Sequence, residues 1–245
     1  DGTTGAAGSD ANAQLTSDID LNGQNWTAIG TDVNPFKGKF DGKGHSISNL
    51  SIDASSGYQG LFGYSSGTIS NVDIKSGQVT NTASNTGSLV GINNAGGIVE
   101  NCSSAAVVTD NSASTSYFGG LVGNNSGTIS KSSFTGTVQT GNETLKQKNF
   151  GGIAGYMSNT DAVIKGCVNT GSIKAYESVE TGNTIVRTAG IVGNADKGSV
   201  YHCYNKGSIS VSSGIKNART AGITARIGNG GKVFNCLNTG KTTTT

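Results

Sequence analysis

Proline, histidine and charge are scarce in this chain of 245 residues, and these scarcities exclude several classes of protein. One proline, Pro35, stands beside 39 glycines, whereas a disordered linker carries both residue types in quantity. Charged residues make up 13% of the chain and the formal net charge is +2, without a basic stripe, so we expect no nucleic-acid partner. There is no run of 18 apolar residues, and we expect no membrane span.

Signatures of metal binding and catalysis are also missing. The two histidines, His45 and His202, lie neither in an HExxH pattern nor in a nucleophile constellation, and the four cysteines show no CxxC spacing. Asp18 and Asp20 alternate onto one strand face and Asp41 lies near His45, but turn and capping roles fit these acids better than calcium binding or acid–base chemistry. We therefore expect no catalytic residue, no metal and no cofactor.

Glycine, serine, threonine and asparagine dominate what is present, and they favour tight turns and short strands over helices. A short block of the form Gly-Leu-apolar-Gly recurs six times, at spacings of 28, 32, 32, 38 and 32 residues. The copies lie at 60–63, 88–91, 120–123, 152–155, 190–193 and 222–225. Six matches at such regular spacing identify an internal repeat.

Two further apolar segments follow most copies of the block. The second segment pairs an apolar residue with Val, Cys or Ser three positions later, as in Ile69/Val72, Val99/Cys102, Ile129/Ser132, Ile164/Cys167, Val200/Cys203 and Val233/Cys236. The third segment is marked by Val79, Val108, Val138, Ile173 and Ile209. Gly, Asn and Ser turns separate the segments and none shows helical periodicity, so each repeat is expected to hold three short strands.

A unit of three strands cannot bury its apolar side alone, and stacking the units buries a continuous core. The sequence therefore predicts an all-β fold, a right-handed parallel β-helix (β-solenoid) of about seven coils with three short strands per coil. A β-propeller is the alternative, but its blades carry four strands, and variable loops stand here where a regular fourth strand would be.

The repeats resemble the GLUG motif, which occurs in tandem in large bacterial surface proteins, including adhesins and the non-catalytic regions of some immunoglobulin-cleaving proteases. The segments 18–21, 26–30 and 40–47 look like the coils that precede such repeats. The resemblance runs from about Leu15 to Gly240 and departs from the pattern at 224–226. It implies a β-helix and a place at the bacterial surface or outside the cell, whereas function is not carried by a repeat that many proteins reuse.

Four parts are expected along the chain: a flexible segment at 1–10, capping coils at 11–58, six GLUG-type repeats at 59–240 and the start of a Thr-rich linker at 241–245. The first ten residues show no signal-peptide pattern. A terminal coil presents unpaired backbone groups, which template pairing with another chain. We expect the last coil to contact a further domain of the parent chain, or a second copy end to end.

Two rows of residues recur at one position of successive coils, and we interpret both as structural. Cys102, Cys167, Cys203 and Cys236 share the position of Val72 and Ser132, which predicts a ladder of buried thiols. Disulfides stay open as an alternative, because stacked Cα atoms about 4.8 Å apart lie within bridging range. Asn169, Asn205 and Asn238 predict an amide ladder or a row of turns, with an exposed ligand-binding face as the alternative.

Variable loops connect the third segment to the next block, at 80–86, 109–118, 140–149, 175–188 and 211–220. All of them fall at one corner of the coil and project from one edge, which in repeat folds is often the binding face. Charged residues, Glu180 among them, gather there, and we expect a ligand to contact Lys146, Lys148, Glu177, Arg187, Lys216 and Arg219. Neutral drift in solvated loops is the alternative.

These features favour a non-catalytic structural and adhesive module of a bacterial secreted or cell-surface protein, with a glycan or an extracellular protein as its ligand. One alternative is a polysaccharide-active β-helix enzyme, or an accessory carbohydrate-binding region of a larger surface enzyme. It requires a row of acids, and Asp73, Glu100 and Asp161 share no repeat position. Another is an ice-binding or self-assembling fibre solenoid, for which the row Thr68, Ile98, Thr128, Val163, Ser199 and Lys232 is too irregular.

Overall fold

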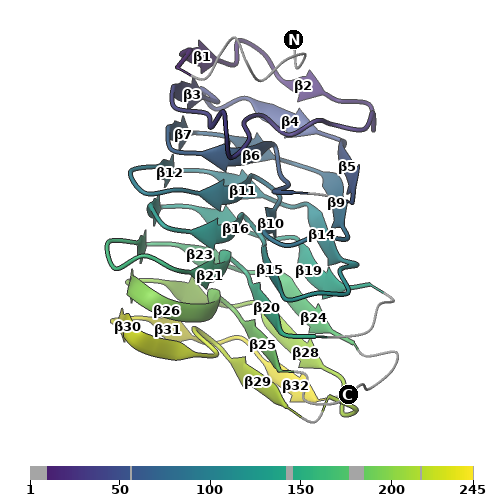
Figure 1. The fold of residues 1–245 in the computed structure, drawn as a ribbon, viewed down its shortest axis with the longest axis vertical. Coiled ribbons are helices and arrows are strands. Elements are labelled where there is room, and N and C mark those ends of the chain that lie inside the picture. Colours follow the sequence, from purple (N-terminus) through teal and green to yellow (C-terminus); the bar gives the residue numbers. More distant parts are fainter. Residues whose placement is uncertain (1–9, 56, 142–145, 177–184, 216, 245) are drawn as a thin grey trace.

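The computed structural model describes residues 10–55, 57–141, 146–176, 185–215 and 217–244, which form strands and no helix. The strands stack as a β-solenoid of about seven turns that runs from the N-terminal to the C-terminal end of the chain (Figure 1). Neighbouring coils pair in parallel, with equivalent residues of successive repeats side by side. The predicted all-β class and the parallel solenoid are thereby confirmed. The described residues contain no helix that could cross a bilayer.

The largest sheet of the described residues has twelve strands in two arms, which β26 (Val192–Tyr201) and β30 (Ile227–Phe234) join. The first four GLUG blocks lead into strands of the first arm: β6 (Phe62–Ser65), β11 (Val90–Asn93), β16 (Val122–Asn125) and β21 (Ala154–Met157). The fifth block leads into β26 and the sixth precedes β30. The second arm holds β1 (Ala13–Gln14), β3 (Lys39–Asp41), β7 (Thr68–Ser70), β12 (Ile98–Glu100), β17 (Thr128–Ser130) and β22 (Val163–Lys165).

Three smaller sheets complete the coil. The eight-stranded sheet holds β2 (Ile19–Asp20), β4 (Ser46–Ser48), β8 (Asp73–Ile74), β13 (Ser103–Ser104), β18 (Ser133–Phe134), β23 (Val168–Asn169), β27 (Tyr204–Asn205) and β31 (Leu237–Asn238). The seven-stranded sheet holds β5 (Leu50–Ala54), β9 (Gly77–Asn81), β14 (Val107–Asp110), β19 (Thr137–Thr140), β24 (Ser172–Ala175), β28 (Ser208–Val211) and β32 (Thr242–Thr244). The five-stranded sheet holds β10 (Thr86–Gly87), β15 (Ser116–Gly119), β20 (Lys148–Gly151), β25 (Val186–Ala189) and β29 (Ala218–Ala221).

The expectation of three strands per coil is wrong, because a full coil has five strand segments. The second apolar segment bends into two strands, as β7 and β8 show, and a further strand such as β10 precedes the GLUG block. The bend is a left-handed residue at one position of every repeat: Asn71, Asn101, Lys131, Gly166, His202 and Asn235, with φ between 49° and 62°. Glycine and asparagine adopt this conformation readily, so the bend was partly visible in the sequence.

The core lies inside the coils as rows of stacked apolar side chains. Ile69, Val99, Ile129, Ile164 and Val200 form one completely buried row. The interior is narrow at the first glycine of the GLUG block: a Cβ added at Gly152 or Gly190 would lie 2.5 or 2.2 Å from the Cγ atom of Asn169 or Asn205 across the coil. Only glycine leaves room there for the opposite side chain.

Candidate functional site

Loops connect the seven-stranded sheet to the five-stranded sheet in each coil, at the corner where the sequence predicts a binding edge. Lys146 is exposed beside this corner, and Arg219 is exposed on β29. Glu177, Glu180 and Lys216 lie outside the described residues. The remaining two charged residues, Lys148 and Arg187, belong to strands β20 and β25.

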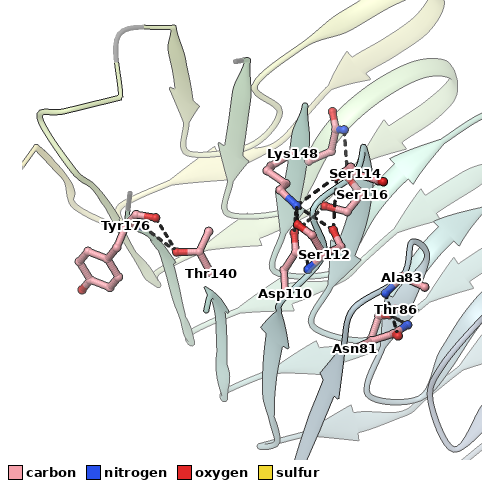
Figure 2. Close-up of polar contacts among 11 residues, drawn as sticks. Asn81, Ala83, Thr86, Asp110, Ser112, Ser114, Ser116, Thr140, Lys148 and Tyr176 are labelled. Carbon is pink, nitrogen blue, oxygen red and sulfur yellow. Dashed lines mark hydrogen bonds and ion pairs between the residues drawn. The ribbon is translucent and has the colours of Figure 1, made fainter. Parts of the chain in front are cut away.

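Lys148 is buried, and the expectation that it contacts a ligand from a solvated loop is wrong. Its side chain is 1% exposed, and its Nζ atom lies 3.1 Å from Oδ2 of Asp110, whose side chain is completely buried (Figure 2). In register, Lys148 lies between Ser116 and Val186 on the inward row of the five-stranded sheet. A buried ammonium group requires acceptors, and the preceding loop supplies them.

Three oxygens of that loop accept hydrogen bonds from Lys148 Nζ. They are the carbonyl and hydroxyl oxygens of Ser112, at 2.5 and 2.7 Å, and the carbonyl oxygen of Ser114, at 3.1 Å. Asp110 in turn accepts from the backbone N–H of Ser112 at 2.8 Å and from the hydroxyl of Ser116 at 2.5 Å (Figure 2). One buried ion pair therefore holds the loop between β14 and β15 in a defined conformation.

Polar residues at the same position anchor the neighbouring loops. Asn81 and Thr140 are the register partners of Asp110 on the adjacent strands. Asn81 donates to the hydroxyl of Thr86 at 2.9 Å, and the Thr140 hydroxyl donates to the carbonyl of Tyr176 at 2.9 Å (Figure 2). We name Asn81, Asp110 and Thr140 the anchor row. Sequence analysis missed it, because the position is polar in only three consecutive coils and is occupied by Ala54, Ala175 and Val211 in the others.

Two outward rows of side chains meet where the five-stranded sheet adjoins the first arm of the twelve-stranded sheet. Tyr117, Asn149, Arg187 and Arg219 stack in register on the five-stranded sheet. Tyr156 and Asn194 stack in register on the first arm, and Arg226 Nη1 donates to Asn194 Oδ1 at 3.0 Å. We use the name Tyr–Arg corner for the group formed by Tyr117, Asn149, Tyr156, Arg187, Asn194, Asp196, Arg219 and Arg226.

Aromatic stacking joins the two rows. The rings of Tyr117 and Tyr156 lie 4.7 Å apart between centroids, with an interplanar angle of 21°. Both side chains are half-buried. Burial raises the pKa of the Tyr156 hydroxyl, and the carboxylate of Asp196 raises it further. Tyr156 is thus an uncharged hydroxyl that can donate or accept a hydrogen bond at neutral pH.

Arg187 is the central cation of the corner. The side chain is 6% exposed, so the expectation of a solvated loop residue is wrong for Arg187 too, because it lies on β25 and packs along the outer row. Its Nη1 atom donates to Asn149 Oδ1 at 3.1 Å, whereas its buried Nε atom has no acceptor among the residues that the structure describes. Burial lowers the pKa of Arg187, and the guanidinium groups of Arg219 and Arg226 lower it further.

The four cysteines lie at one position of their coils, as free thiols. Cys102, Cys167 and Cys203 are buried and Cys236 is half-buried. Each thiol donates to the carbonyl oxygen of the residue two positions earlier, at 3.3–3.4 Å. Burial raises the pKa of Cys102 to about 12, so its thiol is protonated at neutral pH.

Amide side chains form a ladder in the last three coils. Asn169 Nδ2 donates to Asn205 Oδ1 at 2.8 Å, and Asn205 Nδ2 donates to Asn238 Oδ1 at 2.7 Å. Asn169 and Asn205 are completely buried, whereas Asn238 on the last coil is exposed. Each Oδ1 atom also accepts the backbone N–H two residues later. The ladder therefore joins coils and closes turns.

The N-terminal carboxylates accept backbone hydrogen bonds. Asp20 caps a turn by accepting the N–H of Asn22 at 2.7 Å, whereas Asp18 joins two coils by accepting the N–H of Ser46 at 2.8 Å. Asp41 accepts the N–H of Lys43 at 2.8 Å. Hydrogen bonds to these carboxylates lower the pKa of all three. Within the residues that the structure describes, no three His, Cys, Asp or Glu side chains group into a metal site.

Comparison with known proteins supports the repeat assignment. The family model of the GLUG motif matches residues 114–139, which include the third GLUG block. Among solved structures, the chain is similar to a "putative immunoglobulin A1 protease" from Bacteroides ovatus, with a TM-score of 0.56 and 20% sequence identity over 91% of this chain and 77% of that chain. This likeness concerns the fold. No curated protein matches the chain in sequence at a significant level.

Proposed function

We propose that this chain is a structural and adhesive β-solenoid module of a bacterial secreted or cell-surface protein, which binds a glycan or an extracellular protein at the loop corner and the adjoining outer face. One observation carries the proposal: a buried ion pair, Asp110–Lys148, orders a loop at the same corner in which the variable loops of successive coils gather. A desolvated ion pair is costly, and drifting loops need no such internal support. Loops held by a rigid scaffold are typical of binding surfaces.

The GLUG motif and the fold shared with the Bacteroides ovatus protein support a modular role. We propose that any chemistry of the parent protein lies outside these coils, because Asp18 and Asp20, the best paired carboxylates of this chain, each accept a backbone N–H, that of Ser46 on the next coil and that of Asn22. Depolymerisation assays on pectin, alginate and glycosaminoglycans test this part. Cleavage by the purified chain that Asp18→Asn or Asp41→Asn abolishes would establish the enzyme alternative.

A binding array of glycans and extracellular matrix proteins tests the binding role directly. The informative variant replaces the loop 111–115 with a Gly-Ser segment of equal length. We expect the wild-type chain to retain at least one ligand and this variant to bind it at least tenfold more weakly, with the solenoid still folded. Absence of any ligand would leave a spacer and contradict adhesion.

A further inference from the structure

We propose that the Tyr–Arg corner binds an acidic glycan, whose sugar carboxylate the arginines hold while the tyrosine rings pack against the sugar. This inference rests on the proposed function, because it names a ligand chemistry and the face that takes it. The corner adjoins the loop corner, since Arg187 and Arg219 belong to the strands into which the variable loops lead.

The charges of the corner are unbalanced. Arg187 and Arg219 are direct register partners on parallel strands, where like charges repel each other. Among the described residues of the corner, Arg226 forms an ion pair with Asp196, at 2.5 Å. Three guanidinium groups thus face one carboxylate, and an anion would relieve the repulsion. The lowered pKa of Arg187, caused by burial and then by the other two arginines, reflects the same imbalance.

The Nε atom of Arg187, which has no acceptor among the described residues, indicates which group of the corner that anion would satisfy. A buried donor without an acceptor costs on the order of 1–3 kcal/mol, and such groups in native proteins call for an explanation. Asn149 holds the Nη1 atom, and binding at the edge that carries the buried Nε atom requires the side chains that cover it to move aside. A carboxylate accepts two parallel hydrogen bonds from one edge of a guanidinium group.

The tyrosines favour a sugar over a simple anion. The stacked rings of Tyr117 and Tyr156 stand beside the arginine row and combine an apolar face with a polar hydroxyl. A pyranose ring has matching C–H faces and hydroxyl groups. An extended acidic peptide fits less well, because its same-face side chains repeat at about 6.6–6.8 Å, whereas neighbouring arginines are separated by one strand spacing of about 4.8 Å.

Calorimetric titration of the 245-residue chain tests the inference. The probes are tetragalacturonate, an oligomannuronate and sialyllactose, with fully methyl-esterified tetragalacturonate as the uncharged control and a glutamate-rich peptide as the competing class. We expect at least one acidic glycan to bind, with affinity that falls as salt is added. The ester and the peptide should bind at least tenfold more weakly.

Variants locate the site. Arg219→Ala, at an exposed position, and Tyr156→Ala should each weaken binding of the acidic glycan at least tenfold, whereas Lys165→Ala removes an exposed cation from β22 and should change it less than twofold. Melting temperatures show that each variant is folded. Arg187→Lys keeps the charge but loses the Nε edge, so it should also bind at least tenfold more weakly.

Several results would overturn the inference: no acidic glycan binds, the ester or the peptide binds equally well, or the corner variants bind as the wild type does. Failure of the two proposals is distinguishable. An array ligand that is insensitive to the corner variants leaves the adhesive module intact and removes the acidic-glycan site. If the variant with the exchanged loop loses its array ligand but still binds the acidic glycan in the titration, the loop corner and the Tyr–Arg corner are separate sites.

Discussion

At the scale of single residues, one position of every repeat has a left-handed backbone conformation, which is unfavourable for most residue types. Asn71, Asn101 and Asn235 meet the left-handed φ at low cost, whereas Lys131 and His202 hold φ values of 49° and 53° with long or branched side chains. The left-handed region costs a residue with a Cβ atom roughly 1–2 kcal/mol. Packing of the strands on either side imposes the conformation regardless of residue type.

We expect Lys131→Gly to raise the free energy of unfolding by about 0.5–1 kcal/mol, because glycine adopts this φ without strain. The exposed ion pair with Glu100, at 3.0 Å, is lost but contributes little. Lys165→Gly is the matched control. Lys165 lies on strand β22, and we expect glycine at this position to lower the free energy of unfolding. Chemical denaturation measures both, and a destabilised Lys131→Gly variant would contradict the account.

The buried thiol of Cys102 makes stability depend on alkaline pH. Its folded pKa is about 12 against a reference of 9.0, so between these values the unfolded chain has lost a proton that the folded chain keeps. Stability should therefore fall as the pH rises above about 9, by up to about 1.4 kcal/mol per pH unit from this group. Cys102→Val should flatten that slope and still fold, because Val72 occupies the same position. If the stability of the wild type and of Cys102→Val fell with the same slope between pH 9 and 11, the buried thiol of Cys102 would not be the cause.

At the scale of elements, the loop between β14 and β15 depends on a pair of charges from two different coils. Lys148→Met leaves the buried carboxylate of Asp110 uncompensated, and we expect a loss of roughly 3–5 kcal/mol. The double variant Asp110→Leu/Lys148→Met should be more stable than the single one, because it leaves neither charge buried alone. Thermal denaturation of the single and double variants shows the coupling, and additive losses would exclude it.

The GLUG block supplies the apolar residue that each coil buries before its first-arm strand. Leu121 is completely buried, so Leu121→Asp should destabilise the chain by several kcal/mol, on the order of the cost of an unpaired buried charge. Asn124→Asp places the same carboxylate on the outward row of β16 and should change stability by less than about 1 kcal/mol. Equal melting temperatures for the wild type and Leu121→Asp would show that the block does not face inward.

At the scale of the whole molecule, each coil contacts its two neighbours, and the stack gains stability from those interfaces. In the 245-residue chain, Ile227 of the last coil is 53% exposed and Val233 is half-buried, whereas their register partners Ala195 and Val200 are completely buried. We expect amide exchange to be at least tenfold slower in β14 and β19 than in β29 and β31. Uniform protection along the chain at low and high protein concentration would contradict this gradient.

Much of this architecture was predictable because repeats carry redundant information. Six copies of one block place equivalent residues in register without any knowledge of contacts, and the parallel stacking followed from the need to bury three apolar segments. The bend at Asn71 and its equivalents divided one expected strand into two. Its residue types vary from Asn to Lys and His, so the sequence alone concealed a constant backbone conformation.

The candidate sites depended on tertiary contacts. The sequence alone determined the solenoid, the rows of cysteine and asparagine and the corner at which loops gather, because each follows from a spacing that repeats along the chain. Only the tertiary structure decided that Lys148 lies inside against Asp110, and that Tyr117 stacks on Tyr156 beside Arg187. The physical reason is that these partners come from different coils and different sheets, so the angle between the sheets, and not the repeat, brings them together.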